Sequence, residues 1–137
     1  MIRRIDQGMA AAATALVPGE VSPQLRTRYR TLRVMCHTSG LAATYAYVAA
    51  KSNGGDSTAQ AYRRVRDGIG DQLSAMDVVP QSAAHDPREL LTRLGGLDAV
   101  TYLAASAQVT TLLGWMARIA DAVVLDADPA SESVDGS

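Results

Sequence analysis

Three arginines in the first quarter of the chain have a spacing that suits the binding of phosphate groups. Arg26, Arg30 and Arg33 are separated by four and three residues, so a helix would place them along one ridge. A guanidinium group donates paired hydrogen bonds to phosphate oxygens and displaces the counterions that surround nucleic acid. No acidic residue lies three or four positions from any of them, and we therefore expect this ridge to be free of carboxylate partners.

A second group of arginines, Arg63, Arg64 and Arg66, would fan around a single helical turn. Asp67 and Asp71 are placed so that they could neutralise part of this group. Both groups predict phosphate binding, most simply to the backbone of a nucleic acid. The alternative is an ordinary solvated helix face, since an excess of arginine can also reflect the base composition of a genome.

Side chains that could carry out catalysis do not form a recognisable arrangement. None of the three glutamates precedes a histidine by three residues, as di-iron helical bundles require. Cys36 and His37 are neighbours, but consecutive residues of a helix point about 100° apart and do not face each other. We therefore expect no catalytic residue, no metal site, no cofactor and no enzymatic activity, and we expect Cys36 to be a buried thiol in a reducing cytoplasm.

The charged residues are distributed unevenly along the chain. With 13 lysines and arginines against 14 aspartates and glutamates the formal net charge is −1, but five acids and no basic residue follow Arg118. Residues 1–118 therefore carry a net charge of about +4, a distribution that is common in proteins that meet nucleic acid. The acidic end, residues 126–137, has the composition of a disordered tail.

Periodicity and helix-capping signals predict an all-α fold. Proline, glycine and capping residues divide the chain into helices at about residues 2–17, 23–51, 57–76, 87–95 and 98–125. The predicted capping residues are Ser22, Asp56 or Ser57, Asp86 and Asp98. The resulting prediction is a single compact bundle of five to six helices over residues 1–125. No run of residues is long and apolar enough to span a membrane, and we expect no membrane partner.

Gly40 lies within the longest predicted helix, on its apolar stripe. A glycine there costs about 1 kcal/mol relative to alanine, and close contact between two helices is the usual compensation. We expect Gly40 to mark the place where this helix crosses the final one, near Trp115. The alternative is that this smooth face docks a neighbouring subunit. The final helix is expected to carry Val100 and Leu103 among the residues spaced along it.

Three segments of the chain, taken together, resemble the small all-helical subunit of the type III-B CRISPR–Cas effector, the Cmr complex. The segments are YRTLRVMCHTSGLAATYAYVAAKS, AYRRVRDGIGDQL and LDAVTYLAASAQVTTLLGWMARIADAV, and the similarity extends from about residue 3 to residue 124. The residues at the family's characteristic positions are Tyr29, Gly40, Leu41, Tyr47, Lys51, Tyr62, Tyr102, Trp115 and Arg118. Ser39, Leu103 and Ala117 replace the family's usual asparagine, arginine and lysine, so the final helix has two fewer basic side chains than is common.

The resemblance implies a non-catalytic structural subunit of an RNA-guided effector in antiviral defence. Such subunits stack in a row and line the channel in which guide RNA pairs with target RNA, while a neighbouring backbone subunit cuts the RNA. The implied partners are the backbones of guide and target RNA, the backbone subunits of the effector, and further copies of this chain. The candidate RNA-binding residues are Arg26, Arg30, Arg33, Lys51, Arg63, Arg64, Arg66 and Arg118.

Two alternatives stay open at the level of the sequence. One is the equivalent small subunit of the type III-A effector, which is similar to it in build and role. The other is a helical scaffold or adaptor that binds only protein, in which the arginines are merely solvated.

Overall fold

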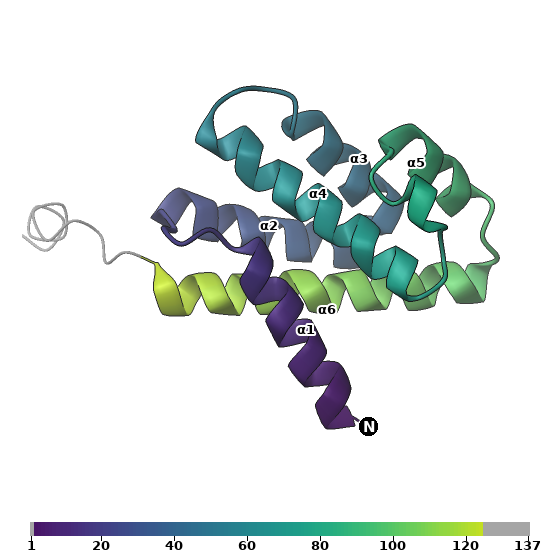
Figure 1. Ribbon diagram of the computed structural model, residues 1–137, viewed down its shortest axis with the longest axis horizontal. Coiled ribbons are helices and arrows are strands. Elements are labelled where there is room, and N and C mark those ends of the chain that lie inside the picture. Colours follow the sequence, from purple (N-terminus) through teal and green to yellow (C-terminus); the bar gives the residue numbers. More distant parts are fainter. Residues whose placement is uncertain (1, 125–137) are drawn as a thin grey trace, which may run out of the picture.

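The computed structural model describes residues 2–124, with side chains from residue 7 onward (Figure 1). Its elements are α1 (Ile2–Leu16), α2 (Pro23–Ser39), α3 (Leu41–Lys51), α4 (Ser57–Ala75), the short 3-10 helix η1 (Gln81–Ala83), α5 (Pro87–Gly95) and α6 (Ala99–Val123). The predicted all-α bundle is confirmed for this part of the chain, whose only β-type contact is an isolated bridge between Val21 and Val124. The predicted acidic tail, residues 126–137, lies outside the described residues.

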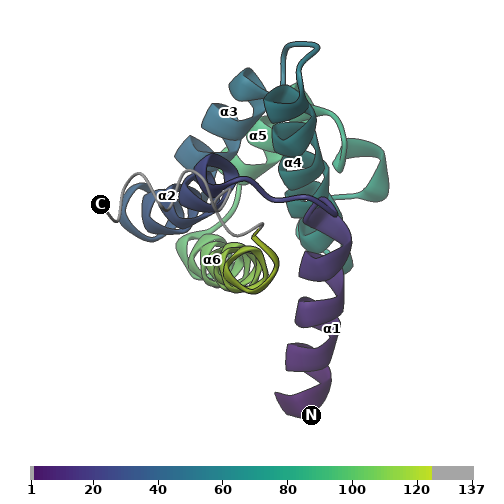
Figure 2. The same ribbon diagram turned by 90° about the vertical axis from the view of Figure 1, so that its left-hand side faces the viewer.

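The helices α2 and α6 lie side by side and run in opposite directions (Figures 1 and 2). Arg30 of α2 contacts Asp121 near the end of α6, whereas Gly40, after α2, contacts Tyr102 near the beginning of α6. α1 packs on α6 and α4, and α3 packs on α2, α4 and α5. The pair of α2 and α6 therefore forms the base on which the other helices assemble.

Side-chain caps begin four of the helices at the predicted places. Ser22, Asp56, Asp86 and Asp98 each accept a hydrogen bond from the backbone N–H three residues later. Each bond satisfies one of the N–H groups that helix geometry leaves without an acceptor. At Asp98, the backbone hydrogen bond from Thr101 lowers the pKa of the carboxyl group. Local sequence thus decides where these helices start.

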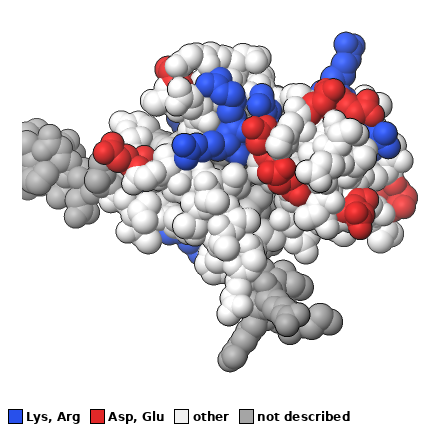
Figure 3. Space-filling model, in the orientation of Figure 1, with Lys and Arg blue, Asp and Glu red and all other residues white. Residues whose placement is uncertain are grey.

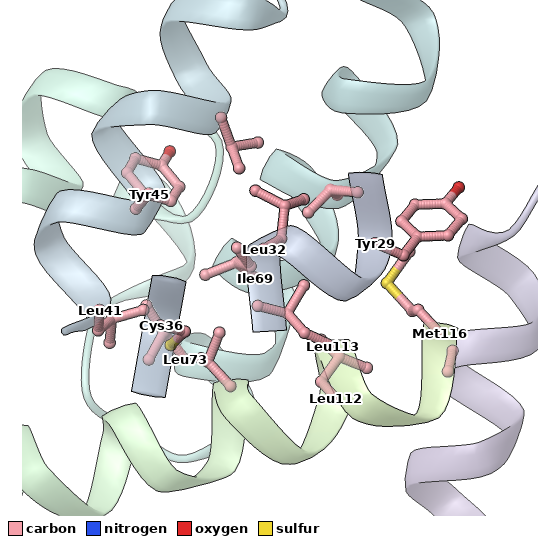
Figure 4. Close-up of a cluster of buried hydrophobic side chains, with 14 of the residues drawn as sticks. Tyr29, Leu32, Cys36, Leu41, Tyr45, Ile69, Leu73, Leu112, Leu113 and Met116 are labelled. Atoms are coloured by element: carbon pink, nitrogen blue, oxygen red, sulfur yellow. The ribbon is translucent and has the colours of Figure 1, made fainter. Parts of the chain in front are cut away.

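The hydrophobic core lies mainly between α2, α3, α4 and α6 (Figure 4). Its largest fully buried side chains include Tyr29, Leu32, Leu41, Tyr45, Ile69, Leu73, Leu112, Leu113 and Met116. Tyr29 and Met116 lie against each other where α2 meets α6 (Figure 4). Burial raises the pKa of Tyr29 and of Tyr45 to about 12, so both phenols are neutral in the core.

Val100 and Leu103, which lie on α6 as expected, do not belong to its buried face. They are 80% and 66% exposed. The buried residues of α6 are Ala105, Val109, Leu112, Leu113, Met116, Ala117 and Ala120. The first turns of α6 contain no charged residue on any side, so periodicity does not select the inward face. The contact of Tyr102 with Gly40 selects the inward face. Around the helix axis, Val100 lies about 160° from Tyr102 and Leu103 lies about 100° from it.

The longest predicted helix, residues 23–51, is in fact two helices that meet at Gly40. Gly40 has φ +92° and ψ 169°, a conformation that residues with a Cβ atom rarely adopt, and α3 begins directly after it. An added Cβ would lie 3.1 Å from the Tyr102 hydroxyl oxygen, which accepts a 2.9 Å hydrogen bond from the N–H of Ala42. Gly40 therefore does mark a contact with the final helix, but against Tyr102 and not near Trp115.

Replacing Gly40 with alanine should lower the free energy of unfolding by about 1–3 kcal/mol, because the strain at positive φ remains whatever surrounds the new methyl group. Tyr102→Phe alone should cost about 0.5–1.5 kcal/mol through the lost hydrogen bond. Most of the Gly40→Ala cost should persist in the double variant, since the missing hydroxyl relieves only the contact with the methyl group. Urea unfolding of the wild type, the two single variants and the double variant measures these free energies. If Gly40→Ala has no effect on the free energy of unfolding in the Tyr102→Phe protein, only the contact with the Tyr102 hydroxyl requires the glycine, and the proposed strain is absent.

Gly70 lies inside α4, where alanine normally stabilises a helix by up to about 1 kcal/mol. Here an added Cβ would overlap the carbonyl oxygen of Ala84, just after η1. Gly70→Ala should therefore destabilise the fold by about 1–3 kcal/mol, as overpacking usually does. Gly8→Ala in α1 is the matched control, because nothing lies within 4 Å of its added Cβ. Thermal unfolding compares the two; equal melting temperatures would contradict the close approach of residue 84 to α4.

Candidate nucleic-acid interface

The eight predicted RNA-binding side chains fall into three groups. The α2–α6 group consists of Arg26, Arg30, Arg33 and Arg118. The loop group consists of Lys51, Arg63 and Arg66, around the connection between α3 and α4. Arg64 stands apart and lines a cleft at the beginning of α4. In Figure 3, blue basic side chains gather over the first half of α4, and red acidic side chains lie beyond them.

Within the α2–α6 group, the expectation of a ridge without carboxylate partners is wrong for two arginines. Asp121 Oδ1 lies 2.6 Å from Arg30 Nη2 and 3.8 Å from Arg26 Nε. Spacing within one helix cannot reveal this partner, because Asp121 belongs to α6, 91 residues after Arg30. The three side chains are between 33% and 54% exposed, and ion pairs at such exposure contribute only about 0–1 kcal/mol.

The other two members of the α2–α6 group, Arg33 and Arg118, line a small surface cavity of about 180 Å³ together with Trp115. Arg33 lies over Gly114, where an added Cβ would come within 3.3 Å of Arg33 Nε. The guanidinium carbon of Arg118 lies 5.9 Å from the Trp115 ring, at cation–π distance. Neither arginine forms an ion pair with any of residues 7–124.

Two arginines of the loop group hold the connection between α3 and α4. Arg63 Nη1 donates hydrogen bonds of 2.7 Å to the carbonyl oxygens of Ser52 and Gly54. Arg66 Nη1 donates to the Ser52 hydroxyl at 3.3 Å, and its Nε pairs with Asp67 at 3.0 Å, which confirms the predicted neutralisation by Asp67. These contacts occupy N–H donors, so both guanidiniums are less available to a ligand than the sequence indicates.

Lys51, the third member of the loop group, begins a row of aromatic and basic side chains. Its Nζ lies 5.6 Å from the Tyr47 ring, which meets the Tyr62 ring edge-on with 6.2 Å between centroids. At the other end of the row, Arg28 Nη1 donates a 3.3 Å hydrogen bond to the Tyr62 hydroxyl, and this bond raises the pKa of Arg28. Sequence reasoning missed Arg28 because it lies off the ridge of α2, and no pattern within α2 reveals that it faces α4.

Arg28 and Arg64 meet at a surface cleft of about 550 Å³. The cleft lies between the connection that follows α1 and the first turns of α2 and α4. The structure thus places Arg64 with a basic residue of another helix and not with Arg63 and Arg66, its neighbours in the sequence.

The side chains best suited to catalysis lie apart from these groups. Cys36 is 2% exposed, and burial raises the pKa of its thiol. His85 Nε2 lies 2.7 Å from Asp71 Oδ1, so Asp71 has a partner other than the arginines expected for it. Within the described part of the chain, no group of three or more His, Cys, Asp or Glu could hold a metal ion. None of the helices described here has the length and apolar character required to cross a membrane.

Comparison with known proteins identifies a family. The family model described as CRISPR-associated protein (Cas_Cmr5) matches residues 6–123, a span that covers nearly all of the described helices. No curated protein and no solved structure matches the chain. The chain therefore belongs to the Cas_Cmr5 family and is a Cmr5-type small subunit of a type III CRISPR–Cas complex.

Proposed function

We propose that the chain is a non-catalytic structural subunit of a type III-B effector, where it lines the channel that holds guide RNA and target RNA. The family match over residues 6–123 carries this proposal, and the exposed arginines of the α2–α6 group support it. Basic side chains contact the RNA backbone, while pairing with the guide supplies sequence specificity. The subunit works in antiviral defence in the cytoplasm, between backbone subunits and further copies of itself.

Arg33 and Arg118 are the strongest candidates for phosphate contacts in the α2–α6 group. Neither pairs with a carboxylate of residues 7–124, and the Trp115 ring orients Arg118 without occupying its N–H donors. Arg26 and Arg30 share the single carboxylate of Asp121. Two guanidiniums paired with one carboxylate leave a net positive charge. Exposed ion pairs contribute only about 0–1 kcal/mol, so a phosphate group can displace the carboxylate.

The outward face of α6 supports contacts with neighbouring subunits. Residues 99–117 contain no charged side chain, and Val100 and Leu103 are among the most exposed large apolar residues of the described chain. Apolar side chains that gather on one surface are typical of faces covered in an assembly. The outward face of α6 therefore fits a backbone subunit or a second copy.

The state of the reactive side chains supports a role without chemistry. The thiolate is the nucleophilic form of cysteine, and the buried Cys36 thiol, with its raised pKa, is held in the neutral form. His37, its neighbour in the sequence, is exposed at the end of α2. RNA cleavage by the isolated chain would contradict this part of the proposal.

Arg33→Ala combined with Arg118→Ala should weaken RNA binding by the assembled effector about equally for all sequences. Each lost phosphate contact should reduce the slope of log affinity against log salt concentration by about 0.7 for single-stranded RNA. The matched control is Arg88→Ala with Arg93→Ala on α5, which removes the same charge elsewhere. An equal loss of RNA affinity in the control would show that only the net charge matters. Wild-type binding that does not depend on salt would favour the alternative of a protein-only adaptor. The measurement uses the assembled effector, because stacked copies bind RNA together more tightly than one copy does.

Asp121→Asn should strengthen RNA binding by about two- to fivefold, since it removes a carboxylate that competes with phosphate for Arg26 and Arg30. The free energy of unfolding should change by less than about 1 kcal/mol, because the ion pair is exposed. A salt titration of RNA binding and urea unfolding measure the two effects. Asp77→Asn removes the same charge at a residue that forms no ion pair within residues 7–124. An equal gain from Asp77→Asn would contradict a local role of Asp121.

A further inference from the structure

The cleft between the beginnings of α2 and α4 has the size and lining of a binding site. Its volume of about 550 Å³ lies within the range of about 300–1,000 Å³ found for small-molecule sites. Seven of its eleven lining residues are polar or basic, and the side chains that matter here are Ser22, Gln24, Arg28, Ser57, Thr58 and Arg64. The cleft is separate from the α2–α6 group, because Arg28 and Arg64 line it at the junction of α2 and α4 and no member of that group does.

The two arginines of the cleft retain donors for a ligand. The side chain of Arg64 is exposed and forms neither a hydrogen bond nor an ion pair with the side chains and backbone described from residue 7 to residue 124. Arg28 donates from Nη1 to the Tyr62 hydroxyl, a bond that fixes its side chain beside the cleft. A guanidinium group has five N–H donors, so this bond leaves most of them for an anion.

Residues with unpaired backbone amides also line the same cleft. Ser22 and Asp56 cap the N–H groups of Leu25 and Ala59, whereas helix geometry leaves the earlier N–H groups of Gln24, Ser57 and Thr58 without an acceptor in their own helices. These three residues all line the cleft. The start of each helix also carries about half a positive charge. The amides reinforce the site that the two guanidiniums define.

Charge and shape favour one phosphate of a nucleotide strand over a free anion. Glu20 is the only acidic residue in the lining, against two guanidiniums. A second cavity, of about 370 Å³, adjoins the cleft and shares Gln24 and Arg28 with it. Tyr47 and Tyr62 line this second cavity, and aromatic rings of this kind stack with nucleobases in proteins that bind single strands.

We propose that Arg28 and Arg64 bind one backbone phosphate of a single-stranded RNA segment in this cleft, with the adjoining nucleoside against Tyr47. The site deepens the proposed RNA-binding function and rests on it. It adds Arg28 to the RNA-binding residues and extends the RNA contact from the α2–α6 group to the junction of α2 and α4. Glu20 weakens the site by repelling the phosphate.

Amide chemical shifts of the full chain locate the binding directly. Decauridylate added to the ¹⁵N-labelled protein should shift the N–H signals of Gln24, Ser57 and Thr58. Uridine monophosphate should shift the same signals at higher concentration, and inorganic phosphate at still higher concentration. No shift at these amides with decauridylate would overturn the proposal. So would a response to inorganic phosphate that equals or exceeds the response to decauridylate, since the site would then take a free anion.

Three variants test the side chains in the assembled effector. Arg28→Ala and Arg64→Ala combined should reduce the salt slope of RNA binding by about 0.7 per copy, the loss of one phosphate contact, and each variant alone should reduce it by no more than that. Glu20→Gln should strengthen binding by about two- to fivefold. Stronger RNA binding by Glu20→Gln cannot arise from misfolding. If Arg28→Ala unfolds the protein, Arg64→Ala tests the contribution of the arginines. Arg88→Ala, on α5 at the opposite end of α4, is the matched control (Figure 1).

The outcomes separate this site from the proposed function. Wild-type binding that falls steeply with salt but is unchanged in the Arg28, Arg64 and Glu20 variants overturns the cleft and leaves the RNA-binding function intact. Wild-type binding without salt dependence overturns both. An effect of Arg88→Ala equal to that of Arg64→Ala overturns the cleft, because it shows that net charge alone acts.

Discussion

The antiparallel contact between α2 and α6 determines where the other helices lie. Tyr29, Leu32 and Cys36 of α2 share one core with Leu113 and Met116 of α6, and complete burial of such side chains contributes about 1.5–3 kcal/mol each. The exposed pair of Arg30 with Asp121 at the edge of this contact contributes about 0–1 kcal/mol. The apolar contact therefore holds the helices together. The ion pair is free to exchange its carboxylate for another anion without loosening the fold.

The same contact sets the direction of α3. The Tyr102 hydroxyl accepts the N–H of Ala42 in the first turn of α3, directly after the break at Gly40. α3 then supports both α4 and α5. Five of the arginines divide accordingly into two kinds. Arg63 and Arg66 hold the connection that follows α3, whereas Arg33, Arg64 and Arg118 are exposed on the surfaces of α2, α4 and α6. Many modest contacts of this second kind suit the proposed function, in which neighbouring subunits share the binding of RNA.

Local signals in the sequence predicted the helices well, but they did not predict the partners of the arginines on other helices. Caps such as Ser22 and Asp98 act on N–H groups three residues away, so the sequence alone reveals them. The contact of Arg30 with Asp121 and the position of Arg28 beside Tyr62 depend on how separate helices pack, which spacing within one helix does not encode. Gly40 combines a local signal with a contact between separate helices. A glycine on an apolar stripe indicates close packing, but the same residue type also allows the positive φ that ends α2.

The pairing of α2 with α6 also has a consequence for synthesis of the protein. The partner of Arg30 is 91 residues further along the chain, and ribosomes add about 5–20 residues per second. The apolar side of α2 therefore waits about 5–18 s for its partner after it has been translated. During this interval the nascent chain exposes Tyr29 and Leu32, which are 1% exposed in the finished fold. A chaperone that binds short apolar helices would have its opportunity in this window, before α6 closes the bundle.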